Sequence, residues 1–222
     1  MKRLLGLMLV CSCMLSSCIE IIDDLTLNLD GSGTFKYTVN LSSSKVKVNS
    51  ILALDSFNGK KVPKIDVIET KFSQFSELLK KEKGIISVQT EFNKVDFIVK
   101  IAVGFSSVQE LQNGVTAVIQ QLDPTMNITQ EAGDWIQWDG KTLQRIIPKL
   151  VEDRIKSDTQ ADNEFLKTGS YTCISRLPHS IQTTSSELCR LNPAKSAAML
   201  RVNALELKLN PALLKHTLTT AP

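Results

Sequence analysis

The chain has 222 residues, of which 26 are Lys or Arg and 23 are Asp or Glu, so its formal net charge is only +3. The nearly neutral balance of the whole chain therefore gives no electrostatic argument for binding nucleic acid or anionic lipid, and we expect no nucleic-acid partner. Aromatic residues make up only 5% of the chain, which argues against a broad carbohydrate-stacking surface. The length is sufficient for a sizeable hydrophobic core.

The first element in the chain is a secretory signal peptide. Lys2 and Arg3 give a positive start, residues 4–15 form an apolar segment, and two small serines follow. The apolar segment is too short to span a membrane as a helix, which takes about 20 apolar residues. The segment therefore predicts export of the chain.

The run Leu15-Ser16-Ser17-Cys18 resembles the lipobox of bacterial lipoproteins, in which a leucine and two small residues precede an acylated cysteine. The resemblance implies that residues 1–17 are removed and that Cys18 becomes the lipid-bearing first residue. Cys11 and Cys13 fit the pattern less well, because a bulky valine precedes Cys11 and only a short apolar segment precedes Cys13. Two or more acyl chains attach a protein stably to a membrane, so the expected partner is a membrane.

A β-hairpin is predicted over residues 25–41, where apolar and polar residues alternate on both sides of the turn Asp30-Gly31-Ser32-Gly33. The Gly-x-Gly in that turn lies between two strands, so turn geometry explains it better than phosphate binding at a helix start. A helix over residues 42–54, with serines as candidate caps, and a loop over residues 57–63 follow.

The middle of the chain predicts a helix, a hairpin and a second helix. Apolar residues recur at helical spacing over residues 65–83, and Gly84 ends this helix. A second hairpin is predicted over residues 85–105, because apolar and polar residues alternate strictly in its second arm, residues 95–105. Ser107 and Glu110 have capping-box spacing at the start of a helix that ends at residue 122.

The last part begins with a third hairpin signal over residues 135–146, around an Asp-Gly turn. A short helix over residues 147–155 is expected next. Residues 169–209 have a strand-like pattern, and Asn210-Pro211 can start a terminal helix.

These elements predict an α+β fold, an antiparallel sheet built from β-hairpins and covered by amphipathic helices. We expect residues 18–24 to form a lipidated tether. Residues 25–222 then form a single globular domain whose C-terminal third is mostly β.

Three features together resemble the LppM-type lipoprotein domain and similar envelope lipoproteins. They are the acylated Cys18 leading into a strand and the turn Asp30-Gly31-Ser32-Gly33, the middle part in which helices alternate with hairpins, and the late strand Tyr171 to Leu177 with another near Ala197 to Val202. The resemblance covers most of the mature chain. It implies a fold and a place in the cell envelope, and no enzymatic activity.

Residues that could carry catalysis do not form a recognisable set. The two histidines, His179 and His216, are not near a Gly-x-Ser-x-Gly motif, which the chain lacks. Cys173 and His179 match no local signature of a cysteine nucleophile. We therefore expect a protein that is not an enzyme and that has no catalytic residues.

Metal and cofactor sites are not expected either. The cysteines and histidines of the folded part lack the short paired spacing of structural zinc ligands. The acidic residues lack the alternating spacing of a calcium loop.

Two states are open for Cys173 and Cys189, the cysteines that remain after the N-terminal region. A disulfide between them could persist in the envelope and would stabilise the fold by about 3 kcal/mol. The alternative is two buried thiols, which behave as small apolar residues. On a strand, Cys173 and Ile174 point to opposite faces. We expect Ile174 to face the core, so Cys173 is expected to be partly exposed.

Trp135 and Trp138 are three residues apart, so on a strand they point to opposite faces. An exposed tryptophan could contact a partner, and the alternative is that both are packed inside.

The leading hypothesis is a non-enzymatic envelope lipoprotein held at a membrane by Cys18, which acts as an interaction or assembly module with an envelope protein partner. The alternatives are a hydrolase of envelope glycan or lipid, and a carrier of a hydrophobic ligand, which a cavity in the structure would favour. Ile19 replaces the Asp of the familiar inner-membrane retention signal, so the outer membrane is the expected location.

Overall fold

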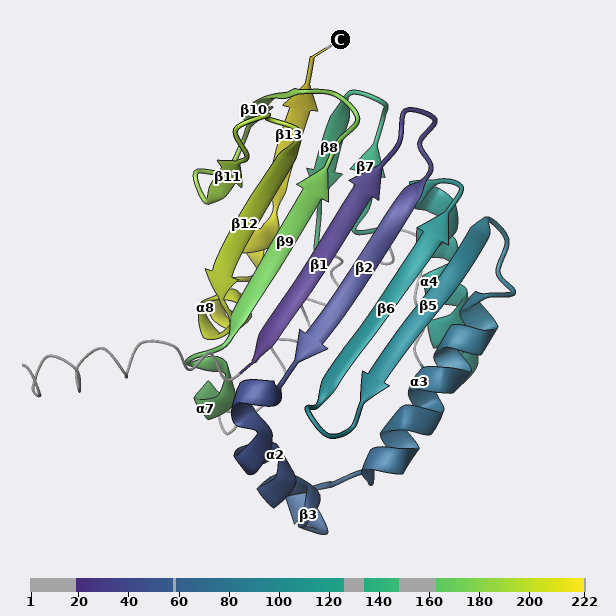
Figure 1. Cartoon of the computed structure of the whole chain (residues 1–222), viewed down its shortest axis with the longest axis vertical. Coiled ribbons are helices and arrows are strands. Elements are labelled where there is room, and N and C mark those ends of the chain that lie inside the picture. The colour runs from purple at the N-terminus through teal and green to yellow at the C-terminus, as the bar shows by residue number, and fades with distance from the viewer. Residues whose placement is uncertain (1–18, 58, 126–133, 148–162, 222) are drawn as a thin grey trace, which may run out of the picture.

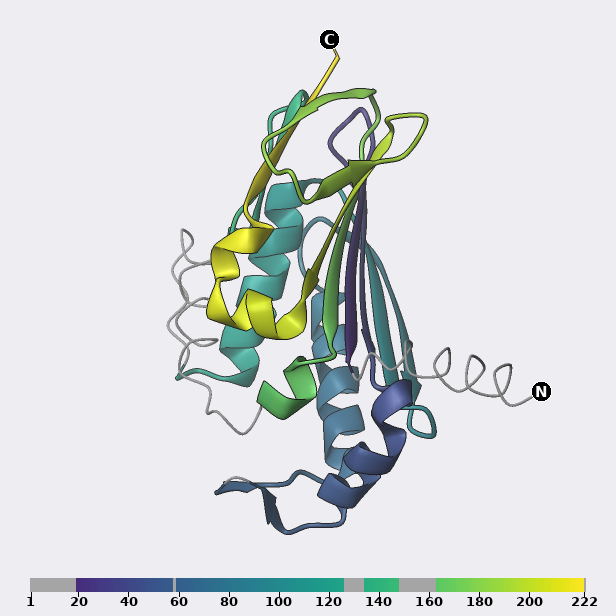
Figure 2. The same cartoon turned by 90° about the vertical axis from the view of Figure 1, so that its left-hand side faces the viewer.

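The computed structural model describes residues 19–57, 59–125, 134–147 and 163–221. A large sheet forms one layer, and two long helices and a smaller sheet lie against one of its faces (Figures 1 and 2). The fold is α+β, as predicted. The predicted signal peptide, Cys18 and most of the short helix predicted over 147–155 lie outside the described residues.

The large sheet has seven strands in the order β11-β12-β9-β1-β2-β6-β5. Its strands, in chain order, are β1 (Glu20–Leu27), β2 (Gly33–Asn40), β5 (Ile85–Asn93), β6 (Ile98–Phe105), β9 (Ser170–Arg176), β11 (Cys189–Leu191) and β12 (Ala197–Asn203). All neighbours are antiparallel except β1 and β9, which run parallel with Glu20 opposite Ser170. The N-terminal strand therefore lies in the middle of the sheet.

Two smaller sheets complete the β structure. The four-stranded sheet has the order β10-β13-β8-β7, and a two-stranded sheet joins β3 and β4. Their strands are β3 (Ser56–Phe57), β4 (Lys60–Lys61), β7 (Ile136–Trp138), β8 (Thr142–Arg145), β10 (Ile181–Thr184) and β13 (His216–Thr220).

Two long amphipathic helices, α3 (Ile65–Leu79) and α4 (Val108–Leu122), cover the inner face of the large sheet (Figure 2). The shorter helical segments are η2 (Ser42–Ser44), α2 (Lys45–Leu52), α7 (Asn163–Leu166), α8 (Ala204–Leu209) and η4 (Pro211–Leu214). In the part of the chain with described coordinates, no helix is both long and apolar enough to cross a membrane.

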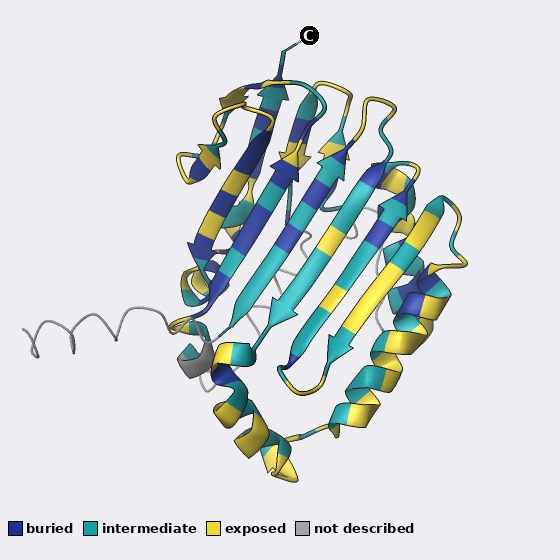
Figure 3. Cartoon of the chain, viewed as in Figure 1, coloured by how far each residue is buried: buried dark blue, intermediate teal, exposed yellow. Residues whose placement is uncertain are grey.

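The hydrophobic core lies between the large sheet, the two long helices and the four-stranded sheet. Side chains with no exposed surface come from all of these layers: Leu25, Leu79, Phe105, Leu111, Leu143, Leu200 and Leu218. The outer face of the large sheet is more open, and β5 at its edge is largely exposed (Figure 3).

Most predicted elements are present. The first hairpin, the hairpin β5–β6 and the hairpin β7–β8 form with the expected partners. The Ser107 side chain accepts a hydrogen bond from the Glu110 backbone N–H, as the capping-box spacing predicts. Gly31 has a φ of +81°, the left-handed conformation that glycine adopts without strain.

Three predictions about the ends of the domain are wrong. Residues 20–24, predicted as a tether, form the start of the central strand β1, because β9 and β2 both pair with them. Residues 204–209 form α8 and are not a strand; the Asn203 side chain accepts hydrogen bonds from Leu205 and Glu206 and so caps this helix. The terminal helix is only the short η4, and the chain then runs into strand β13.

Candidate functional site: a pocket between the two sheets

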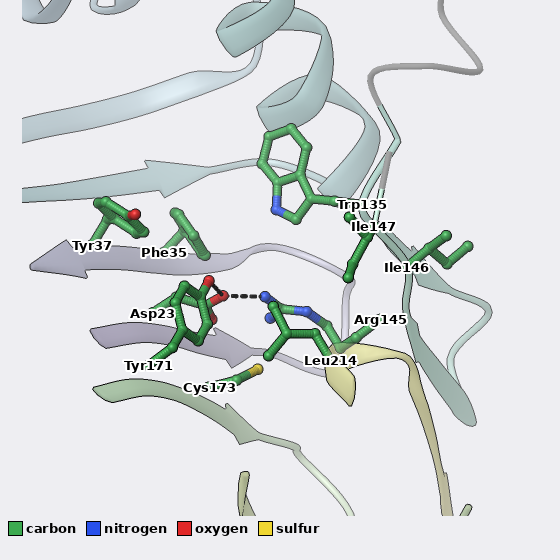
Figure 4. Close-up of a pocket in the computed structure, with 10 residues that line it drawn as sticks. All are labelled: Asp23, Phe35, Tyr37, Trp135, Arg145, Ile146, Ile147, Tyr171, Cys173 and Leu214. Atoms are coloured by element: carbon green, nitrogen blue, oxygen red, sulfur yellow. Dashed lines mark hydrogen bonds and ion pairs between the residues drawn. The ribbon is translucent and has the colours of Figure 1, made fainter. Parts of the chain in front are cut away.

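A pocket of about 260 Å³ lies where the inner face of the large sheet meets the four-stranded sheet. The large sheet contributes residues of β1, β2 and β9. The other wall comes from β7, β8 and η4 and the residues beside them (Figure 4). The described lining consists of Asp23, Phe35, Tyr37, Trp135, Arg145, Ile146, Ile147, Tyr171, Cys173 and Leu214.

Strand register explains why the lining side chains of β1, β2 and β9 lie together. In the large sheet, Asp23 lies opposite Tyr37 on β2 and opposite Cys173 on β9. Residues opposite one another in a sheet point to the same face, and so do residues two apart on one strand. Phe35 and Tyr171 therefore join these three side chains on the inner face.

A buried ion pair connects the two walls. Arg145 Nη2 lies 2.5 Å from Asp23 Oδ2, and the two side chains are only 7% and 4% exposed. Tyr171 donates a hydrogen bond of 2.8 Å from its hydroxyl to the same carboxylate oxygen (Figure 4). Taking both charges out of water costs several kcal/mol per ion, so such a pair needs its remaining polar atoms satisfied.

Two charged atoms at this pair lack a partner among the described residues. They are Asp23 Oδ1 and Arg145 Nη1, both buried and without a hydrogen bond. Buried polar atoms in native proteins are nearly always hydrogen-bonded, to protein, water or ligand. Both residues line the pocket, but these two atoms have almost no accessible surface, so the charged pair lies directly beneath the pocket lining.

The opposite part of the lining is apolar and aromatic. Phe35 and Trp135 meet edge to face, with ring centroids 6.3 Å apart and an interplanar angle of 61°. Gln112 on α4 holds the tryptophan segment, because its side-chain oxygen accepts hydrogen bonds from the backbone N–H groups of Trp135 and Ile136 at 2.6 and 2.7 Å. The pocket thus combines an aromatic wall with a charged end.

Burial keeps the titratable neighbours of the ion pair in their neutral forms. Burial raises the pKa of Cys173 to about 12, and burial together with the charge of Asp23 raises the pKa of Tyr37 to about 12. The same two causes raise the pKa of Tyr171 well above its usual value. Burial also lowers the pKa of His216, whose Nδ1 lies 2.8 Å from the Leu214 carbonyl oxygen.

Arg145 stays charged despite its burial. Burial opposes the charge, but the adjacent Asp23 carboxylate outweighs that cost and raises the pKa of the guanidinium above its usual value. The pocket consequently holds one permanent cation beside one carboxylate, and its thiol and phenols are neutral at neutral pH.

The two cysteines lie on the inner face of the sheet as buried, unbridged thiols. Leu200 of β12 lies between them, opposite both Cys173 and Cys189. Adjacent strands are about 4.8 Å apart, so the two backbones are separated by about twice that distance, beyond the reach of a disulfide. The expectation that Cys173 is partly exposed is wrong: Cys173 is 3% exposed, and its neighbour Ile174 lies on the outer face.

The tryptophans are packed differently from the strand prediction, and the two histidines lie in separate parts of the fold. Trp135 and Trp138 are both half-buried and pack against the core, so neither is the exposed anchor that strand alternation suggested. His216 is buried opposite Arg145 in the four-stranded sheet, whereas His179 lies in the loop between β9 and β10.

Sequence reasoning missed the central residues of this site, Asp23, Arg145 and Tyr171. A signal existed for the aspartate: it shares its alternation with Leu25 and Leu27, which marks it as an inner-face residue. Among the described residues, no group of three His, Cys, Asp or Glu side chains is placed to hold a metal ion.

No protein-family model matches the chain. No curated protein matches it either. Among solved structures, the chain is similar to the NMR structure of the folded domain of Mycobacterium tuberculosis LppM. That match has 11% sequence identity and a TM-score of 0.41, and it covers 94% of this chain and 94% of that chain.

The match to LppM agrees with the LppM-type resemblance predicted from the sequence. At 11% identity it concerns the fold alone, and at a TM-score of 0.41 no residue role, ligand or location is carried over.

Proposed function

We propose that this protein is a non-enzymatic envelope lipoprotein, anchored through an acylated Cys18, whose folded domain binds a small amphipathic molecule in the pocket between its two sheets. The observation that carries the binding function is the pair of unpartnered atoms, Asp23 Oδ1 and Arg145 Nη1, beside an apolar and aromatic cavity.

The dimensions and chemistry of the pocket define the ligand class. An apolar cavity of about 150 Å³ holds benzene, so 260 Å³ accommodates a larger ring system or a short alkyl chain. In the proposed complex the ion pair opens, so that its buried acceptor and donor, Asp23 Oδ1 and Arg145 Nη1, meet the polar group of the ligand. A carboxylate, sulfonate, amide or hydroxyl on an apolar body is the matching chemistry.

The state of the titratable groups supports binding without turnover. A nucleophile or general base works best when its pKa lies near the operating pH. The pKa values of Cys173, Tyr37 and Tyr171 are raised far above neutrality, and Asp23 is engaged by Arg145. The pocket therefore favours the ligand carrier over the hydrolase, and over the interaction module as first proposed.

The binding proposal can be tested with 8-anilinonaphthalene-1-sulfonate, a probe that has apolar rings and one sulfonate. We expect its fluorescence to rise on mixing with the mature protein. Leu214→Trp adds bulk at the half-buried rim of the pocket and should abolish the rise without loss of the fold by circular dichroism. Leu209→Trp is the matched control, because Leu209 is 73% exposed and does not line the pocket.

Equal fluorescence for both tryptophan variants would overturn the binding proposal. Incubation with envelope glycans and lipids tests the absence of turnover. Hydrolysis that is lost in Asp23→Asn would overturn the non-enzymatic role.

The anchor requires its own test, because Cys18 lies outside the described residues. Cys18→Ser should release the mature protein from the membrane fraction or leave its signal peptide uncleaved. Persistent membrane association of a correctly cleaved, acyl-free variant would contradict lipid anchoring as the sole tether. Fractionation of inner and outer membranes tests the expected outer-membrane location.

A further inference from the structure

A cationic segment projects from the end of the large sheet at which β1 begins. It comprises η2, α2 and the β3–β4 hairpin, residues 42–64, and we call it the basic end segment (Figure 1). It contains five lysines, Lys45, Lys47, Lys60, Lys61 and Lys64, and one acidic residue, Asp55. Asp96 in the β5–β6 turn pairs with Lys45 at 3.2 Å, which leaves the segment with an excess of positive charge.

The same segment exposes apolar side chains and contributes little to the core. No residue of α2 is buried, although its sequence KVKVNSIL is half apolar. Val46 is 82% exposed and Leu54 is 48% exposed. The adjoining β5–β6 turn adds Val95, which is 68% exposed next to the Lys45–Asp96 pair. Exposed aliphatic residues among lysines are typical of surfaces that lie in the headgroup region of a bilayer.

Chain connectivity places this surface next to the proposed anchor. Glu20, the first residue of β1, lies opposite Asn40, the last residue of β2, and the basic end segment starts two residues after Asn40. Cys18 is two residues before Glu20, and two residues of chain span at most about 7 Å. Acyl chains on Cys18 would therefore hold this end of the sheet at the lipid surface, while the chain ends in β13 at the opposite end (Figure 1).

We infer that the basic end segment is a second, non-covalent membrane contact, which docks on anionic lipid and orients the domain on its anchor. The orientation rests on the proposed acylation of Cys18, but the affinity of the segment for anionic lipid does not. Each lysine near an anionic surface contributes about 1 kcal/mol.

Vesicle sedimentation of acyl-free protein tests the contact. The mature chain with Cys18→Ser contains every described element, because β1 begins at Glu20. We expect it to bind vesicles of phosphatidylcholine mixed with phosphatidylglycerol and not vesicles of phosphatidylcholine alone. Lys61→Gln with Lys64→Gln, at two exposed lysines, should weaken this binding roughly thirtyfold, which is about 1 kcal/mol for each lysine.

The matched control is Lys80→Gln with Lys81→Gln, which neutralises two lysines just beyond the C-terminal end of α3. This variant should bind vesicles as the unchanged protein does. Val46→Asp tests the apolar component and should also weaken binding. Absence of binding to anionic vesicles, equal binding to neutral vesicles, or equal loss in the control pair would each overturn the inference. Because this assay uses acyl-free protein, a failure of anchoring at Cys18 leaves its result unaffected.

A second measurement addresses orientation in the acylated protein. A fluorophore on Ser50→Cys in α2 should be quenched by brominated lipids, since the two native thiols of the domain are buried and do not compete for the label. The same fluorophore on Asn192→Cys in the β11–β12 turn should not be quenched. Equal quenching at the two positions would contradict the proposed orientation.

Discussion

The two flanks of strand β1 are assembled in different ways. On one side, β2, β6 and β5 come from one continuous stretch, residues 33–105, and pair antiparallel with one another. On the other side, β9 pairs parallel with β1 from about 150 residues further along the chain, and β12 and β11 follow. The first flank is built within one part of the chain, whereas the second requires β1 to pair with a strand from a distant part of the chain.

The pocket lies where the two flanks meet. We call β2, β6 and β5 the local flank and β9, β12 and β11 the distant flank. Asp23 on the shared strand β1 lies opposite Tyr37 of the local flank and Cys173 of the distant flank, and it pairs with Arg145 of the four-stranded sheet. The comparison shows that the unusual buried charges are concentrated where parts of the chain far apart in sequence are joined. The local flank is stabilised by apolar contacts and turns.

The largest expected effect comes from breaking the ion pair at this junction. Asp23→Ala leaves the Arg145 guanidinium buried without a carboxylate, and removal of one partner of a buried pair costs about 3–5 kcal/mol. Urea unfolding of the mature protein measures this loss.

Asp24→Ala is the neighbouring control for the ion pair. Asp24 points to the outer face, where it pairs with Arg176 at 3.0 Å and the two side chains are 19% and 49% exposed. Exposed pairs contribute about 0–1 kcal/mol, so the control should lose little stability. Similar losses for the two alanine variants would show that the junction is no more sensitive than the surface.

Gln112 connects the helix that covers the local flank to the start of β7. Gln112→Leu would leave the backbone N–H groups of Trp135 and Ile136 without their acceptor in a buried site. Each unsatisfied buried group costs about 1–3 kcal/mol, so for the two groups we expect a loss of about 2–6 kcal/mol together with a changed tryptophan emission. Gln109→Leu on the exposed face of the same helix is the control, and an equal loss there would contradict the connecting role.

The turn of the first hairpin tests the local flank itself. A Cβ on Gly33 would lie 2.2 Å from the Thr26 carbonyl oxygen and 2.7 Å from the Phe105 ring, so Gly33→Val forces the strands apart. Overpacking of this kind costs about 1–3 kcal/mol. At Gly31 a Cβ meets open space, and only its φ of +81° is unfavourable, which costs about 1–2 kcal/mol. Thermal unfolding should therefore show that Gly33→Val is destabilised more than Gly31→Val. The reverse order would contradict the close approach of the strands at Gly33.

The comparison of the flanks also explains what the sequence could predict. Hairpins, turns and the Ser107 cap depend on residues within a few positions, so alternation and spacing predict them. The place of residues 20–24 depends on β9, which no local pattern specifies. The pair of Asp23 with Arg145 spans 122 positions of sequence, so the site could not be assembled from local motifs.

The inner face of β9 was ambiguous for a different reason. Its sequence SYTCISR places Tyr171, Cys173 and Ser175 on one face and Thr172 and Ile174 on the other, and neither set is clearly more apolar. The two sets exchange faces if the register shifts by one residue. Only the pairing with β1 and β12 selects the face that carries Cys173.

The smallest expected effect is the contribution of His216, on the C-terminal strand β13, to the pH dependence of the free energy of unfolding. Burial lowers its pKa from the usual 6.5, so the folded protein binds a proton at this imidazole less readily than the unfolded chain does. Stability due to this group is therefore complete above pH 6.5, decreases as the pH falls below that value, and levels off below the lowered pKa.

His216→Gln removes the titration and should flatten the decrease in unfolding free energy between neutral pH and pH 5. Asp23 and Arg145 face the same region, and the variant retains both, so any slope they contribute remains. An unchanged slope in His216→Gln would show that burial of this imidazole is not its cause.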